Sequence, residues 1–207
     1  MKELRLLKKI QQQIESCRRC PHVCGTPVHG PAVISKIFLL GQAPGIHEAT
    51  YGRPFAYTAG KTLFKWILDH TGVEEEHFRE NVYMAAVLRC FPGKVSQKGD
   101  RVPTLDEIKN CQSFIQGELN TLQPELILAV GKIAIQEVLG AQYTKKTKLV
   151  DVVGQLIQTE YLGHKVDVLC LPHPSGISTW PHSPEGKAKL KKAFQLLRKH
   201  PAWSTLS

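Results

Sequence analysis

No stretch of this 207-residue chain is apolar over a length that could cross a membrane. Its first residues, MKELRLLKKIQQQIES, are charged and lack the apolar segment of a secretory signal peptide. Internal repeats and low-complexity linkers are also absent. A length of 207 residues suits one globular domain with its own core. We therefore expect a single cytoplasmic domain over residues 1–207, with no membrane contact.

Acidic residues are few, with 18 Asp and Glu against 27 Lys and Arg, so the formal net charge is +9. Such a balance favours a polyanionic partner, most simply nucleic acid. Charge alone leaves open the simpler alternative of a merely basic surface. The basic side chains gather in the segment 89–101 and in a C-terminal helix expected over 184–199.

Four of the six cysteines form two widely separated pairs. Cys17 and Cys20 form a C-x-x-C motif, whose spacing lets both sulfurs face one centre. Cys90 and Cys111 can complete a shell of four thiolates from a distant segment. Four thiolates suit either a tetrahedral zinc ion or an iron–sulfur cluster. Either group would tie the N-terminus to the middle of the chain.

Other interpretations of the cysteines remain open from the residues alone. Disulfides need an oxidising compartment, for which the sequence offers no signal. Free thiols and a redox pair are further alternatives, although a thioredoxin-type C-x-x-C usually follows a strand and not a helix. Cys24 lies close enough to Cys20 to reach the same centre. Cys170 lies in the apolar run VDVLCLP, so we expect it in a buried strand.

Strand and helix patterns alternate along the chain. Short apolar runs predict strands over 36–41, 81–88, 125–131, 154–161 and 165–171. Apolar periodicity predicts helices over 2–16, 59–71, 105–122, 132–139 and 184–199. Thr104 and Glu107 form a capping box at the start of the third helix. The alternation predicts an α/β fold with a mainly parallel sheet and helices on both faces.

Ligands of such sheets bind beyond the carboxyl ends of the strands, where the segment 41–62 begins. Gly41 and Gly45 allow a tight turn close to a ligand. Gln42 offers both a donor and an acceptor, as recognition of a base edge requires. Glu48 is the nearest acid, and a solvated loop carboxylate is the simpler interpretation of it.

Three ring side chains are also candidates in these loops. Phe55 could stack on a ligand or could belong to the core. His173 stands between Pro172 and Pro174 at a strand end, where two prolines restrict the backbone that carries it. Trp180 could be an exposed wedge or an anchor for the last helix. We expect His173 to be functional.

In their order and spacing, these motifs resemble the iron–sulfur branch of the uracil-DNA glycosylase superfamily, the family 4-like enzymes. The C-x-x-C, GQAPG, GRPF-x-x-x-AGK and HPS motifs and the second cysteine pair span residues 15 to 190. The resemblance implies a three-layer αβα fold with a central, mainly parallel four-stranded sheet. It also implies an N-terminal helix and cysteine pair over 1–30 and a catalytic core over 31–200.

The resemblance further implies a DNA-repair hydrolase that cuts the N-glycosidic bond of uracil in DNA. Its partner would be DNA with a deaminated base flipped into a pocket, and we expect a monomer. Cys17, Cys20, Cys90 and Cys111 would hold a [4Fe–4S] cluster, with zinc the less favoured occupant. Cys24 would then be a bystander.

Roles transfer by position from the family to this chain. Glu48 would orient or activate the attacking water, and His173 would stabilise charge on the departing base. Phe55 would stack on the base, and the backbone from Gly41 to Gly45 would face it. The implied substrate-binding residues are Gly41, Gln42, Ala43, Gly45, Phe55, Ala86 and Ser175.

Two departures from the family pattern bear on the substrate. Gln42 stands where this family usually has glutamate, and Ala43 stands where the GQ-D-P motif of other uracil-DNA glycosylases has its aspartate. Ala85 and Ala86 stand where an asparagine reads the uracil edge. An alanine offers no hydrogen bond, so we expect weaker discrimination for uracil, or another base such as hypoxanthine or xanthine. A module that binds nucleic acid without cutting it is the alternative, and a zinc-stabilised nucleotide-binding protein is a third.

Overall fold

The computed structural model describes residues 2–95, 99–175 and 179–206. Within them one sheet has five strands in the order β2-β1-β3-β5-β4. Four strands run parallel, and β4 pairs antiparallel with β5. The strands are β1 (Ile37–Gly41), β2 (Tyr83–Ala86), β3 (Leu126–Val130), β4 (Leu156–Tyr161) and β5 (His164–Leu171). The α/β fold is confirmed, but the sheet has five strands and not four, because β4 extends its edge.

The central strands are apolar because helices cover both of their faces. Every residue of β1, β2 and β3 is buried, as is usual for parallel strands between two helical layers. In β4 exposed and less exposed residues alternate, because one face of this edge strand meets solvent. The buried centre is what gave these segments a clear apolar signal in the sequence.

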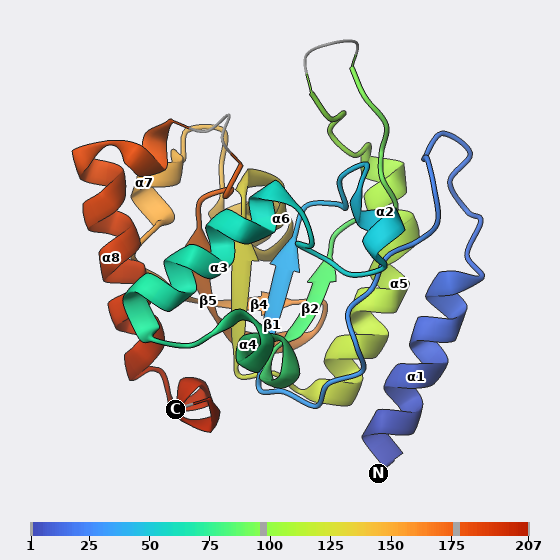
Figure 1. The fold of residues 1–207 in the computed structure, drawn as a ribbon, viewed down its shortest axis with the longest axis horizontal. Helices are drawn as coiled ribbons and strands as arrows, with labels where there is room; N and C mark the ends of the chain where they lie inside the picture. Colours follow the sequence, from blue (N-terminus) through green and yellow to red (C-terminus); the bar gives the residue numbers. More distant parts are fainter. Residues whose placement is uncertain (1, 96–98, 176–178, 207) are drawn as a thin grey trace.

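Two helical layers enclose the sheet (Figure 1). On one face the core joins side chains of the sheet to those of α1, α5, α6 and α7. On the other face the core joins the sheet to α3, α4, α8 and a C-terminal 3₁₀ turn, η3. The bounds are α1 (Lys2–Glu15), α3 (Thr58–Thr71), α4 (Glu75–Asn81), α5 (Leu105–Leu122), α6 (Lys132–Leu139), α7 (Leu149–Val152), α8 (Pro184–Lys199) and η3 (Pro201–Thr205).

Helix ends follow the capping signals of the sequence. The predicted ranges 105–122, 132–139 and 184–199 are confirmed at both ends by α5, α6 and α8. At the start of α5 the Thr104 side chain accepts a hydrogen bond from the Glu107 backbone N–H, and the Glu107 carboxylate accepts one from the Thr104 backbone N–H. The short helices α2 (Glu48–Tyr51), α4 and α7 and the 3₁₀ turns η1 (Gly140–Gln142) and η2 (Trp180–His182) were not predicted.

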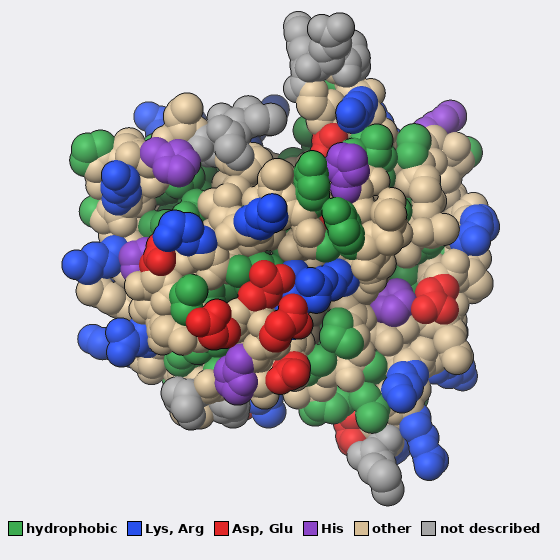
Figure 2. All heavy atoms as spheres, in the orientation of Figure 1, with side chains coloured by type: hydrophobic (Ala, Val, Ile, Leu, Met, Phe, Trp, Pro, Cys, Tyr) green, Lys and Arg blue, Asp and Glu red, His purple; other side chains and the backbone are tan. Residues whose placement is uncertain are grey.

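The parallel strands end at the top of Figure 1, and the surface in Figure 2 is hollowed on that side. Carboxylates gather in front over α4, which carries Glu75, Glu76 and Glu80. This acidic cluster therefore lies away from the hollow, although Glu48 and Asp100 line the cavity on that side. No described helix is both long and apolar enough to cross a membrane.

Candidate active site and cysteine cavity

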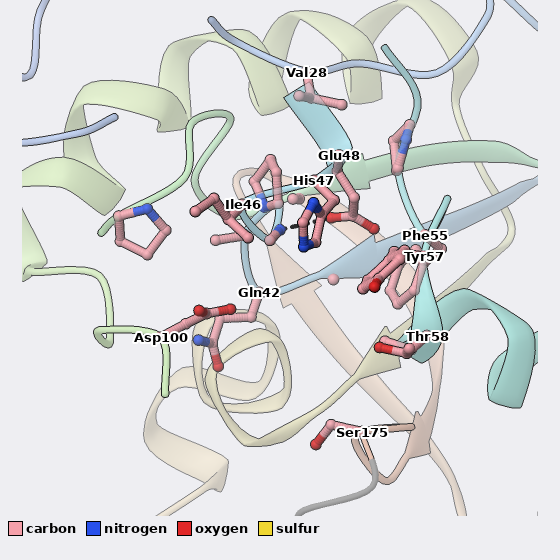
Figure 3. A pocket seen from close by; sticks show the side chains of 18 of the residues that line it. Val28, Gln42, Ile46, His47, Glu48, Phe55, Tyr57, Thr58, Asp100 and Ser175 are labelled. Atoms are coloured by element: carbon pink, nitrogen blue, oxygen red, sulfur yellow. Dashed lines mark hydrogen bonds between the residues drawn. The ribbon is translucent and has the colours of Figure 1, made fainter. Parts of the chain in front are cut away.

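A cavity of about 720 Å³ lies at the carboxyl ends of β1, β2 and β5. Figure 3 shows Phe55 and Tyr57 on one side of it and Gln42 and Asp100 on the other. The structure brings every non-cysteine site residue predicted from the sequence to this cavity: Gly41, Gln42, Ala43, Gly45, Glu48, Phe55, Ala86, His173 and Ser175. These residues come from three separate segments, so their meeting is a product of the fold.

Glu48 is the first residue of α2 and is 8% exposed, which rules out the solvated loop carboxylate. Its Oε2 accepts a hydrogen bond from the Gly45 N–H at 2.7 Å. Its Oε1 accepts one from the Ala56 N–H at 3.1 Å. Burial raises the pKa of the Glu48 carboxyl, and these N–H groups oppose the rise. The carboxylate is thus fixed in direction and titrates at higher pH than an exposed glutamate.

Phe55 occupies a backbone conformation that L-residues seldom adopt, with φ of 53°. Two glycines make room for it. A Cβ on Gly41 would lie 2.9 Å from the Phe55 ring, and a Cβ on Gly60 would lie 1.7 Å from the Phe55 carbonyl oxygen. The ring packs partly against the core and partly lines the cavity. The core interpretation of Phe55 therefore holds for part of the ring, and stacking of the rest on a ligand stays a prediction.

Arg79 of α4 holds the backbone on which Phe55 sits. It is 5% exposed and donates to the Pro54 oxygen at 3.0 Å and to the Phe55 oxygen at 2.8 Å. Its Nε donates to Glu75 at 2.8 Å. Arg79 is not among the site residues predicted from the sequence. The available signal was the Glu75–Arg79 spacing of four residues, which pairs side chains on one helix face.

His173 follows β5 and faces the cavity. Its Nδ1 accepts a hydrogen bond from the Ser175 N–H at 3.2 Å, so in the neutral ring Nε2 carries the proton. A Cβ on Gly131 would lie 2.9 Å from Cδ2 of His173, so the glycine gives the ring its place. Burial lowers the pKa of His173, and Asp100 opposes this. The imidazole is therefore neutral at physiological pH and can donate through Nε2.

Ala86, which stands where the resemblance implies a base-reading asparagine, brings no polar side-chain atom to the cavity. Ala86 ends β2 opposite Gly41, and the next two backbone N–H groups already donate to the Gly41 and Gln42 carbonyls at 2.9 and 3.1 Å. The Gln42 side chain points into the cavity (Figure 3). No hydrogen bond joins its amide to another described residue. Gln42 thus presents an unused donor and acceptor.

A second, smaller cavity of about 130 Å³ is lined by Cys17, Cys20, Cys90 and Cys111 together. Burial, and to a smaller extent the three other thiols, raises the pKa of Cys90 to about 12. Cys24 is exposed and does not line this cavity. Within the described ranges, no group of three or more His, Cys, Asp and Glu is placed to hold a metal ion.

Arg89 lies between β2 and Cys90 and is 1% exposed. It lines the cysteine cavity and pairs through Nη2 with Glu118, which is fully buried. Its Nε and Nη1 are buried and have no hydrogen-bond partner in the described part of the chain. Arg89 belongs to the basic segment 89–101, but its side chain is inside and adds nothing to a basic surface.

Parts of two predicted loops, residues 96–98 and 176–178, lie outside the described residues. Trp180 is described, and it is partly buried against the core on the α5–α6 face of the sheet. The buried side chains of α8 belong to the core on the other face, so this packing tests neither the wedge nor the anchor interpretation of Trp180. Cys170 is buried in β5, as expected.

The comparisons with known proteins agree with this geometry. Residues 27–198 match the model of the uracil DNA glycosylase superfamily. The chain is 30% identical over 197 residues to a type-4 uracil-DNA glycosylase of Archaeoglobus fulgidus, covering 93% of this chain and 94% of that protein. It is 30% identical over 173 residues to the type-4 enzyme of Thermotoga maritima, covering 82% of each chain. The chain therefore belongs to the uracil DNA glycosylase superfamily.

Proposed function

We propose that this protein hydrolyses the N-glycosidic bond of uracil, or of another deaminated base, in DNA and leaves an abasic site. The observation that carries the proposal is the meeting of Glu48, His173 and Phe55 at one cavity. A fixed carboxylate, a neutral imidazole and a stacking ring are what removal of a flipped base requires. The names of the type-4 relatives point to uracil.

The cavity volume of about 720 Å³ accommodates a flipped nucleotide. The base stacks on the Phe55 ring, whose position Gly41 and Arg79 fix. Glu48 orients a water toward the sugar carbon and accepts its proton as the bond breaks. Because both carboxylate oxygens of Glu48 are held by backbone N–H groups, little reorganisation is needed in the transition state.

His173 acts on the departing base. As the glycosidic bond breaks, negative charge develops on a base oxygen, and the Nε2–H of His173 donates to it. The hydrogen bond from the Ser175 N–H to Nδ1 fixes the ring and its tautomer. Burial lowers the pKa of His173 and keeps the ring neutral. The ring therefore donates a hydrogen bond to the base without carrying a positive charge before the glycosidic bond breaks.

Base selection rests on Gln42 in this chain. Ala86 cannot hydrogen-bond, whereas the unpaired amide of Gln42 can donate to and accept from one base edge. A base edge left unpaired in a dry pocket costs about 1–3 kcal/mol for each group. We infer that the enzyme discriminates among deaminated bases less sharply than an asparagine-containing relative would.

We propose that the four cysteines hold a [4Fe–4S] cluster. A zinc ion binds thiolates at about 2.3 Å and draws four sulfurs onto one point. Four cysteines spread around a cavity of about 130 Å³ fit a larger group. The two unpartnered N–H groups of Arg89 at the same cavity fit an anionic, sulfur-rich occupant. The cluster would supply a cross-link between α1 and the segment after β2, outside the base cavity.

A base-release assay on anaerobically purified protein tests the function. Oligonucleotides with a single uracil, hypoxanthine, xanthine or thymine mismatch are incubated with the protein and then cut by alkali at abasic sites. Cleavage at one lesion that Glu48→Ala and His173→Ala abolish, and that the exposed control Glu160→Ala retains, supports the proposal. Absence of cleavage at every lesion, with iron and sulfide verified, would instead assign a nucleic-acid-binding module.

A further inference from the structure

Arg89 has an incomplete set of hydrogen bonds although it lies in the interior. Its Nη2 donates to Oε2 of Glu118, and the Tyr83 hydroxyl donates to Oε1 at 2.8 Å. Both carboxylate oxygens are therefore engaged. The Nε and Nη1 of Arg89 remain buried with no partner among the described residues. They are the side-chain atoms of the described chain that show this defect.

The defect is costly for the protein taken alone. A buried donor without a partner costs about 1–3 kcal/mol. A buried ion pair offsets the loss of solvation only when its remaining protons are also bonded. Glu118 is 0% exposed and Arg89 is 1% exposed, so solvent does not supply the missing acceptors. The group that occupies the adjacent cavity is the remaining source of a partner for Nε and Nη1.

The location of Arg89 indicates which group that is. Arg89 lines the cavity of Cys17, Cys20, Cys90 and Cys111 and is the sequence neighbour of Cys90. Sulfur atoms of a cluster and its thiolates are anionic acceptors, and hydrogen bonds to them tune such centres. Tyr83 and Glu118 hold the guanidinium in place, as the partners of a ligand usually do.

We propose that Arg89 is a fifth protein group of the cluster site, donating Nε–H and Nη1–H to sulfur atoms of the cluster or of its cysteines. This inference rests on the cluster proposed above. The positive charge of Arg89 offsets part of the negative charge of four thiolates. It therefore slows loss of the cluster and favours its more reduced form, which carries more negative charge.

The competing explanation is that Arg89 serves Glu118 alone. Replacing only Arg89 would leave a buried, unpaired carboxylate and would confuse the two. The informative variant is therefore Arg89→Met combined with Glu118→Gln, because the Tyr83 hydroxyl can still donate to the glutamine oxygen. Arg19→Met is the control, since Arg19 also lines the cavity but is exposed and bonded to Asn110 and Ser113.

The proteins are purified anaerobically, and three quantities are measured: iron and sulfide per chain, iron release to a chelator, and midpoint potential by film voltammetry. Circular dichroism monitors the fold. We expect the double variant to release iron about 10- to 100-fold faster, and to have a lower potential. Arg19→Met is expected to match the wild type in each quantity.

Wild-type release and potential in the double variant would overturn the role of Arg89. If the double variant does not fold, Arg89→Lys decides, because lysine keeps the charge beside Glu118 but lacks the planar fork of donors. Faster release from Arg89→Lys supports the proposal, and the wild-type rate overturns it. Wild-type protein that holds zinc or no metal after anaerobic purification would refute the cluster itself. That result differs from an intact cluster whose iron release and potential do not depend on Arg89.

Discussion

Replacement of Arg79 by methionine is expected to lower the rate of base release, although Arg79 itself does not line the base cavity. Two donors to the Pro54 and Phe55 carbonyls are lost, at 3.0 and 2.8 Å in the intact protein. Each charge-assisted bond contributes about 1.5–3 kcal/mol. They hold Phe55 at φ of 53°, a conformation that costs about 1–3 kcal/mol in a non-glycine residue. Once the donors are gone, that strain favours a relaxed backbone with the ring displaced.

If the conformation that holds the Phe55 ring at the cavity is destabilised by about 3 kcal/mol, kcat/KM falls roughly 150-fold. Steady-state base release, measured beside thermal unfolding, gives both the catalytic and the structural effect. Arg53→Met is the control, because Arg53 is exposed and its 3.2 Å pair with Glu76 contributes less than about 1 kcal/mol. A variant Arg79→Met that unfolds at lower temperature yet keeps the wild-type kcat/KM would refute the reasoning.

Three further predictions concern the cavity itself. Ala86→Asn is expected to raise kcat/KM for uracil about 5- to 150-fold over other bases, by supplying the missing amide; unchanged ratios would exclude position 86 from base reading. Gly41→Ala places a methyl group 2.9 Å from the Phe55 ring and is expected to raise KM while the fold, followed by circular dichroism, persists. The pH profile of kcat/KM should fall on the acid side through the pKa of Glu48, which burial has raised, since the carboxylate must be charged to accept a proton. Glu48→Gln should abolish this acid-side fall and lower kcat/KM about 10²–10⁴-fold. An acid-side fall that persists in the variant would belong to another titrating group.

The parts of this fold that could be predicted from the sequence are those whose signals are local. The α5 bounds follow from the capping box of Thr104 and Glu107, and the buried strands follow from their apolar runs. Glu48 and His173 could be nominated because they follow strands whose carboxyl ends meet at one edge. Helix α4 gave no such signal, because it has only seven residues.

The parts that could not be predicted depend on contacts between distant segments. Arg79 is buried because the Pro54 and Phe55 carbonyls need donors, and nothing near position 79 in the sequence states that need. Arg89 belongs to a basic segment of the sequence, yet its side chain is buried because it pairs with Glu118, 29 residues away. In both cases a long-range acceptor, and not local propensity, decides where a charged side chain lies.

The same long-range logic links the two cavities. One segment that begins at the end of β2 lines both cavities. Ala86 lines the base cavity, Arg89 and Cys90 line the cysteine cavity, and Pro92 and Asp100 line the base cavity again. A group that fixes Cys90 therefore fixes a wall of the base cavity from behind. Loss of the proposed cluster should then weaken base release through the position of this wall, although no cysteine of the set lines the base cavity.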